Sequence, residues 1–228
     1  MLLYILQVQS PIETLNRPTW KLLRFNKPIH DRLLLLVATS NEHKKIANLI
    51  SVLGHPVLTV PVFTAISLFH YEDALKALWI SALIFGGVFI PLSVKMYHGA
   101  KSGEYTNFDV SEQRQRQSWY TWATGLLFML CIVLWLTGQS QGLRTVIQLA
   151  LLLMVTAQLV NFFIKSSLHM SLNVFLAFLI FPISLIAGIF FCCFILLIGW
   201  SRLRLGRHTV KEIITGTLIG LIFGLASL

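Results

Sequence analysis

Charged residues are scarce in this chain of 228 residues, where they make up 12% of the sequence. An ordinary soluble domain has about 25%. The acidic residues are fewest, with 9 Asp and Glu against 18 Lys and Arg. Hydrophobic residues reach 56%, and the mean hydropathy is +0.75. This balance excludes a soluble globular or disordered chain and predicts a protein that crosses a membrane several times.

Cysteine is also rare, and its three copies, at positions 131, 192 and 193, all lie inside apolar runs. They have neither the spacing of a zinc site nor that of a disulfide framework. No group of carboxylates or histidines has metal-ligand spacing, so we expect no metal and no cofactor. The start of the chain, MLLYILQVQS, lacks the basic region and cleavage pattern of a signal peptide.

Long hydrophobic runs are abundant, and a membrane-spanning helix needs about 20 apolar residues. Runs close to or above this length occupy residues 46–69, 75–94, 119–137, 146–164, 170–200 and 209–228. As one helix, residues 170–200 would be about 46 Å long, whereas the hydrocarbon core is about 30 Å thick. We therefore expect a hairpin of two short passes, broken near 182–188. The sequence predicts an all-α bundle of seven passes, or six if 170–200 is one helix.

The first 45 residues differ from the rest, because they hold seven Lys and Arg and an apolar run, 33–37, that is too short to span. We interpret residues 1–45 as a basic segment lying on the membrane surface and 46–228 as the helix bundle. The net charge of +9 lies mostly in this segment and between the runs. We therefore expect anionic lipid headgroups or a phosphate as partners and no nucleic acid, with the oligomeric state left open.

Seven passes would place the N-terminus and segments 95–118, 165–169 and 201–208 on one membrane face. That face would carry 16 of the 18 Lys and Arg, with only Lys76 and Arg144 on the other. Excess Lys and Arg mark the cytoplasmic side. We therefore expect an integral protein of the bacterial inner (cytoplasmic) membrane, with these segments in the cytoplasm.

From the three segments on this face, the last extended to Glu212, we select a candidate set of cations, hydroxyls, two histidines and one well-placed carboxylate. They are Arg114, Arg116, Lys165, Ser166, Ser167, His169, Arg202, Arg204, His208 and Glu212. Cations can hold the nonbridging oxygens of a phosphate, one histidine can attack phosphorus, and another can protonate the leaving oxygen. This set favours phosphoryl transfer without a metal.

The stretch SRLRLGRHTVKE, residues 201–212, resembles the third motif, SRxxxxxHxxxD, of the phosphatidic acid phosphatase type 2 and haloperoxidase superfamily. Ser201, Arg202 and His208 match it in spacing, and Glu212 replaces the aspartate. The likeness is to the integral membrane lipid phosphatase branch and covers about residues 46–228.

The other two motifs of the family are matched in part. SSLH, residues 166–169, resembles PSGH through Ser167 and His169. The first motif, KxxxxxxRP, aligns with Arg116, although Gln117 replaces the proline and Asp109 stands at the lysine position. Arg114 is a rival for the arginine, and Lys101 or Lys165 could supply the missing cation.

The resemblance implies an α-helical lipid phosphatase with a phosphohistidine intermediate and a lipid phosphate as substrate. His208 would be the nucleophile, oriented by Glu212. His169 would act first as general acid and then as general base. Arg116, Arg202, Ser167 and Lys165 would surround the phosphate. Phosphatidic acid and a polyprenyl diphosphate are the leading substrates.

Simpler interpretations of single residues remain. Thr209 and Glu212 fit a capping box at a helix start. Arg204, Arg207 and Lys211 suit membrane-surface anchors, His98 suits a structural role, and His55 beside Pro56 suits a kink. For the whole chain, the alternative is a catalytically inactive relative that acts as a scaffold or binds lipid. A transporter is less favoured, because the polar residues gather at one face and not at mid-membrane.

Overall fold

The computed structural model describes residues 41–106, 109–110 and 112–228, and every regular element in these ranges is helical. The elements are the helix Asn41–Leu53, α3 (Pro56–Tyr71), α4 (Ala74–Ile84), η1 (Phe85–Phe89), α5 (Ile90–Ser102), α6 (Gln113–Leu136), α7 (Gln141–Val160), α8 (Leu168–Ile180), α9 (Leu185–Arg204) and α10 (Val210–Leu225). The predicted all-α bundle is confirmed. The predicted surface segment 1–45 lies outside the described residues except for its last five.

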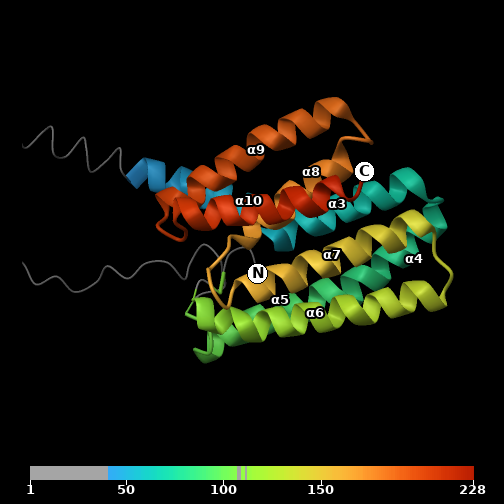
Figure 1. Cartoon of the computed structure of the whole chain (residues 1–228), viewed down its shortest axis with the longest axis horizontal. Coiled ribbons are helices and arrows are strands. Elements are labelled where there is room, and N and C mark those ends of the chain that lie inside the picture. Colours follow the sequence, from blue (N-terminus) through green and yellow to red (C-terminus); the bar gives the residue numbers. More distant parts are fainter. Residues whose placement is uncertain (1–40, 107–108, 111) are drawn as a thin grey trace, which may run out of the picture.

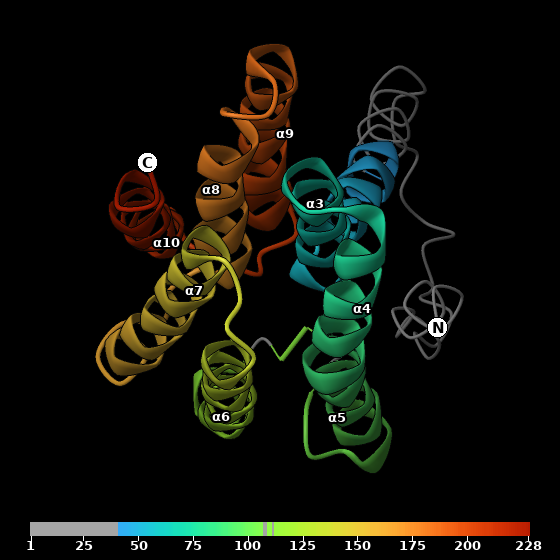
Figure 2. The same cartoon turned by 90° about the vertical axis from the view of Figure 1, so that its right-hand side faces the viewer.

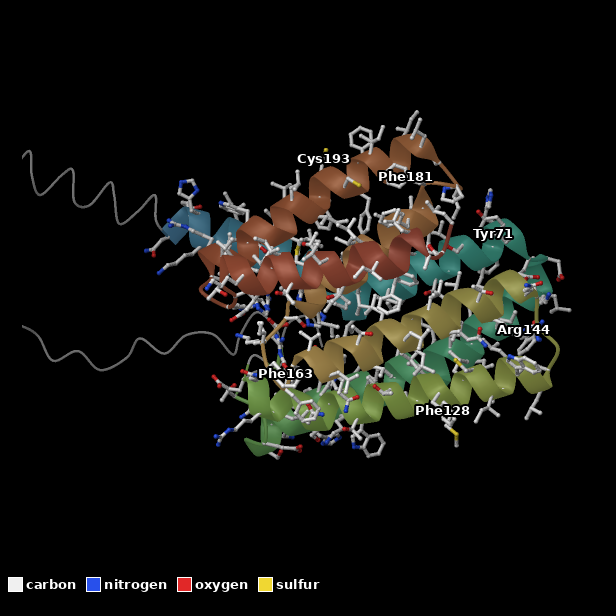
Figure 3. The ribbon with its side chains drawn as sticks, viewed as in Figure 1. Tyr71, Phe128, Arg144, Phe163, Phe181 and Cys193 are labelled. Atoms are coloured by element: carbon white, nitrogen blue, oxygen red, sulfur yellow. The ribbon has the colours of Figure 1, made fainter. Side chains whose placement is uncertain are left out.

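Four helical stretches are long and apolar enough to cross a membrane: Ala74–Ser102, α6, α7 and α9. The helix Asn41–Leu53 and α3 would together make a fifth, bent by 44°. Large apolar side chains cover the outside of the bundle, as Phe128 and Phe163 illustrate with 55% and 86% exposure (Figure 3). This surface is compatible with a membrane protein, while the count of six or seven passes stays a prediction.

Two predicted breaks in the helices are confirmed. His55 ends the first helical stretch by capping α3, because its Nδ1 accepts a hydrogen bond from the Val57 amide at 3.1 Å and Pro56 occupies the first helical position. Residues 181–184 separate α8 from α9. The resulting hairpin returns the end of α9 to the end of the bundle where α8 begins (Figure 1).

The predicted polar segment 95–118 is wrong at both ends. α5 continues to Ser102, and α6 already begins at Gln113. The ammonium of Lys95, within α5, lies over the rings of Tyr105 and Trp122, 5.5 and 5.7 Å from their centres. Such cation–π contacts stabilise a positive charge beside apolar surface.

The short helix α8 packs against α3, α9 and α10 (Figures 1 and 2). Its contact with α10 is very close, since a Cβ at Gly216 would stand 2.4 Å from the Ser167 carbonyl oxygen. A Cβ at Gly220 would stand 2.5 Å from that of Ser171. Glycine is needed where two backbones approach in this way. The contact fixes the start of α10 against the start of α8.

Candidate active site

The predicted site residues meet at one end of the bundle. The α5–α6, α7–α8 and α9–α10 connections all lie there, opposite the α6–α7 turn and the C-terminus (Figure 1). The hairpin of α8 and α9 is what allows this, because it carries the segments 165–169 and 201–208 to the same end.

His208 and Glu212 form a pair at the start of α10. Nδ1 of His208 lies 2.7 Å from Oε2 of Glu212, one helical turn further on. Thr209 caps the helix and accepts a hydrogen bond from the Glu212 amide at 3.4 Å, so one half of the predicted capping box is present. The Glu212 side chain turns to the imidazole. Since a carboxylate only accepts, Nδ1 carries the proton.

The second ring nitrogen of His208, Nε2, lies 3.4 Å from an Nη of Arg116. A guanidinium only donates, so Nε2 presents its lone pair. Burial lowers the pKa of His208, and the charges of Arg202, Arg116 and Lys165 lower it further, to about 2. The imidazole is therefore neutral near pH 7, with its lone pair on Nε2. A nucleophile needs this state.

Arg116 is buried and held by backbone oxygens on two sides. Its Nε donates to the Val110 carbonyl at 2.9 Å, and an Nη donates to that of Ser166 at 2.6 Å. Arg114, two residues earlier on α6, is exposed. Residues two apart lie on different faces of a helix, so only one of the two arginines can face the site. The structure places Arg116 there.

Arg202 is buried completely at the end of α9. One Nη donates to the Ser51 hydroxyl at 2.9 Å, and the other lies 2.5 Å from Oδ2 of Asp109. Its carbonyl oxygen accepts from the amides of Arg207 and His208 at 3.1 and 3.3 Å. The turn that presents His208 is thus built on the backbone of Arg202.

Lys165 and Ser167 connect the start of α8 to this turn. Nζ of Lys165 donates to the Arg207 carbonyl at 2.9 Å and lies 3.5 Å from Oε2 of Glu212. The amide of Ser167, the N-cap residue of α8, donates to the Glu212 carbonyl at 3.0 Å. Its hydroxyl is buried and has no hydrogen-bond partner among the described residues.

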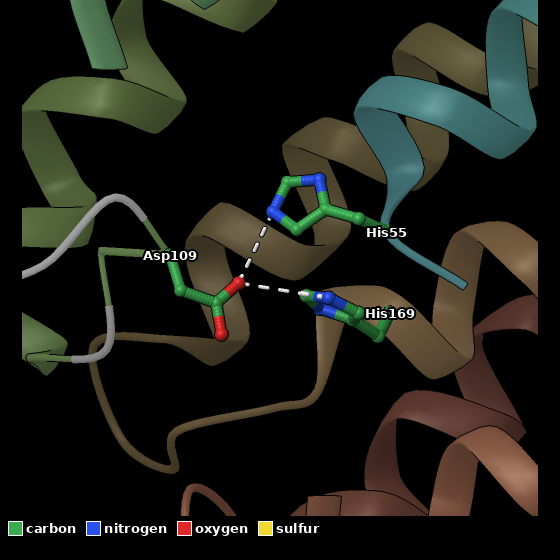
Figure 4. A group of neighbouring side chains, drawn as sticks. All are labelled: His55, Asp109 and His169. Carbon is green, nitrogen blue, oxygen red and sulfur yellow. Dashed lines mark ion pairs between the residues drawn. The ribbon is translucent and has the colours of Figure 1, made fainter. Parts of the chain in front are cut away.

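Asp109 contacts two histidines (Figure 4) and two arginines. Its Oδ1 lies 3.2 Å from Nε2 of His55 and 3.5 Å from Nε2 of His169. Its Oδ2 contacts Arg202 and lies 3.2 Å from Arg207. Burial alone would raise the pKa of Asp109, but Arg202, His169 and His55 together hold it well below its usual range. The carboxylate is therefore charged.

Several of these partners differ from the predictions. His55 was expected only to mark a kink, whereas it also faces Asp109 and packs its ring edge-on to that of His169, 4.8 Å between centres. Arg207 was expected at the surface, but its guanidinium turns inward to Asp109 and Ser51. Arg204 and Lys211 are exposed, as a surface role requires, and Lys101, the alternative to Lys165 for the missing cation, is exposed too.

His55, Asp109 and His169 also satisfy a distance criterion for a metal site, since their ligand atoms lie within 4.8 Å of one another. These residues are far apart in the sequence, so no metal-ligand spacing there could indicate this group. If Nε2 of His55 bound a metal ion, the ring proton would have to be on Nδ1. Nδ1 instead accepts a hydrogen bond from the Val57 amide. Arg202 and Arg207 also place positive charge beside Asp109, which disfavours a cation there. The chemistry therefore favours two histidines turned toward a carboxylate over a metal ion.

A small cavity of about 40 Å³ lies beside His169. His55, Asp109 and Arg116 line it together with apolar side chains that include Met96 and Trp119. A cavity needs roughly 10–15 Å³ to hold a water molecule. This cavity therefore has room for water, and it adjoins the predicted general base.

Comparison of the chain with protein-family models, with curated proteins and with solved structures finds no match. The family resemblance therefore rests on the motif residues alone, and a function rests on the geometry of the site.

Proposed function

We propose that this protein is a metal-independent lipid phosphate phosphatase that works through a phosphohistidine on His208. The proposal rests on the tautomer and the orientation of this histidine. Glu212 holds the proton on Nδ1, and the lone pair of Nε2 faces the guanidinium of Arg116 at 3.4 Å. A neutral imidazole aimed at an anion-binding cation is poised to attack phosphorus.

The surroundings of His208 suit a phosphate. Four cations, Arg116, Lys165, Arg202 and Arg207, lie around two carboxylates, so the charged groups sum to a positive value. Nε of Arg202 and the hydroxyl of Ser167 are buried donors with no hydrogen-bond partner among the described residues. Nonbridging phosphate oxygens would accept from both, and the start of α8 adds a helix N-terminus that favours anions.

In the first step, the Nε2 lone pair of His208 bonds to phosphorus and the bond from phosphorus to the lipid oxygen breaks. His169 gives a proton to that oxygen, and the lipid leaves as an alcohol. Arg116 and Arg202 stabilise the charge on the nonbridging oxygens. Glu212 keeps the proton on Nδ1 and balances the positive charge that develops on the ring.

In the second step, His169 takes a proton from a water molecule and the water oxygen attacks phosphorus. The bond from phosphorus to Nε2 breaks, the electron pair returns to His208, and orthophosphate leaves. The cavity beside His169 has room for a water molecule next to the base that this step requires.

A lipid fits the surroundings of the site, because the bundle that bears it has an apolar exterior. Phosphatidic acid is the leading substrate, and a polyprenyl diphosphate is the second. The phosphate-binding side chains would serve both, since they recognise the headgroup only.

One observation favours a second candidate, an inactive relative that binds lipid phosphate without turning it over. Asp109 stands where the family motif has its lysine, and its carboxylate already engages Arg202 at 2.5 Å. A site with this pairing could retain its structure without accepting a phosphoryl group.

The test is release of orthophosphate from dioctanoyl phosphatidic acid by the purified protein in detergent with EDTA. The wild-type protein should release orthophosphate. The His208→Ala variant should release no more than the background, and its thermal unfolding temperature should be unchanged. His98→Ala is the matched control, because His98 is exposed on α5 outside the site and its removal should leave turnover unchanged.

Wild-type-like turnover in His208→Ala would refute the nucleophile. A wild-type protein that binds phosphatidic acid vesicles but releases no phosphate would favour the inactive relative. Loss of activity in EDTA that added zinc restores would refute the metal-independent step.

A further inference from the structure

The sequence has a carboxylate where the resembled motif has a cation. Asp109 precedes Arg116 by seven residues, the spacing of the lysine in that motif. It is nevertheless buried, with 8% of its side chain exposed. Burying a charged group is costly unless the group is paired, so the contacts of Asp109 indicate what it does.

The two oxygens of Asp109 serve different partners. Oδ2 faces the guanidinium groups of Arg202 and Arg207 at 2.5 and 3.2 Å, and Arg202 has no exposed surface. A fully buried guanidinium needs a counter-charge, and Oδ2 supplies it. Oδ1 points the other way, toward Nε2 of His55 and of His169.

His169 is held on several sides within the first turn of α8. The ring of His55 packs edge-on against it, and the amide group of Asn173 donates to its carbonyl oxygen at 2.7 Å. Asp109 lies 3.5 Å from its Nε2, and both residues line the same cavity. A carboxylate beside an imidazole fixes the orientation of the ring through the nitrogen that it faces.

We propose that Asp109 is a positioning residue for His169, which orients the imidazole through Oδ1 while Oδ2 keeps Arg202 in place. This role rests on the proposed phosphatase function. It gives the site two histidine–carboxylate pairs, one for the nucleophile and one for the general acid. With Nε2 of His169 turned to Asp109, Nδ1 is the nitrogen that serves the leaving oxygen.

The competing explanation is that the Asp109 carboxylate occupies the place of the substrate phosphate. Removing its charge would then release Arg202 and raise the affinity for phosphate. A positioning residue behaves oppositely, because its loss slows the step that needs the acid. The leaving group separates the two explanations, since only a poor leaving group requires protonation.

The experiment compares kcat of Asp109→Asn on dioctanoyl phosphatidic acid and on p-nitrophenyl phosphate. The first releases an alcohol that needs a proton, and the second releases an anion that is stable without one. We expect a loss of about 10- to 100-fold on the first and less than about threefold on the second, part of the 10² to 10⁴ that general acid–base catalysis supplies. The double variant with His169→Ala should be no slower than His169→Ala alone.

Asp109→Glu covers the case in which the asparagine variant fails to fold, because it keeps a charge beside Arg202 but moves the oxygen away from His169. It should show the same dependence on the leaving group. Asp73→Asn is the matched control, since Asp73 caps α4 at 3.0 Å from the Lys76 amide and asparagine caps equally well. It should leave both rates unchanged.

Equal losses on the two substrates, or an unchanged or increased rate on phosphatidic acid, would overturn the role of Asp109 and leave the phosphatase intact. A wild-type protein that hydrolyses neither substrate would refute the phosphatase and this role together.

Discussion

At the scale of single residues, Arg116 connects three segments of the site. Its three nitrogens reach the carbonyl oxygens of Val110 and Ser166 and the Nε2 of His208. The planar guanidinium can make these contacts at once, because its donors point in fixed directions. A lysine carries the same charge without that geometry.

Arg116→Lys should therefore lower kcat/KM by roughly 10²-fold, the loss typical when one donor to a developing oxyanion is removed. Arg114→Lys is the matched control on the same helix and should be neutral, since Arg114 is exposed. Phosphate release by the two variants is the measurement. An effect of Arg114→Lys as large as that of Arg116→Lys would show that the buried contacts have no part in turnover.

Some residues of the site could be predicted from the sequence and others could not. His208, Glu212 and Arg202 stand within one short stretch, so their spacing alone places them together. His55 and Asp109 are separated by 54 positions in the chain, and no local pattern connects them. Their meeting depends on the bend before α3 and on the path of the α5–α6 segment, which are tertiary features.

At the scale of elements, the contact between α8 and α10 aligns the site. The Ser167 amide donates to the Glu212 carbonyl at 3.0 Å across this contact, so the two motif segments share a hydrogen bond. Gly216 stands one turn beyond Glu212 and leaves no room for a side chain.

Gly216→Ala should therefore destabilise the protein and reduce activity, because the added methyl group would stand 2.4 Å from the Ser167 oxygen and the backbone cannot yield. Overpacking of this kind costs about 1–3 kcal/mol. Gly125→Ala in α6 is the control, since its Cβ would have no neighbour within 4 Å. Thermal unfolding in detergent measures both, and equal unfolding temperatures would contradict the close contact.

The sequence predicts helix breaks better than helix ends. The length of 170–200 exceeds the bilayer, so a break could be predicted, and it occurs at 181–184. The start of α6 could not be predicted, because Arg114 and Arg116 are charged residues and suggest a loop. Arg116 is stabilised by carbonyl oxygens from other segments, which only the folded chain supplies.

At the scale of the whole molecule, the distribution of the basic residues predicts which side of the membrane the site faces. Arg114, Arg116, Lys165, Arg202, Arg204 and Arg207 are set aside as possible phosphate ligands or neighbours. The seven-pass topology then leaves 10 basic residues on the face of the site and two on the other. Seven of the 10 precede the first apolar run, residues 46–69, where such charges have most influence. We therefore expect the site to face the cytoplasm and to draw phosphatidic acid from the inner leaflet.

Cysteine labelling in intact cells tests this orientation. On a chain without its native cysteines, Ser140→Cys should react with a membrane-impermeant maleimide and Ser102→Cys should not. Both serines are exposed, and they end α5 and precede α7 at opposite ends of the bundle (Figure 1). Labelling at 102 but not at 140 would reverse the orientation and make a polyprenyl diphosphate the better substrate.

The brevity of α8 affects how a lipid would reach the site. Its 13 residues rise about 20 Å, some 10 Å less than the hydrocarbon thickness. If its far end lies near the opposite surface, its first turn, with His169, stands below the level of the headgroups. A lipid would then have to sink partway into the bilayer, or the bilayer would have to thin around this helix, before its ester oxygen met the proton donor. The depth of the site would make thin membranes better hosts for turnover than thick ones.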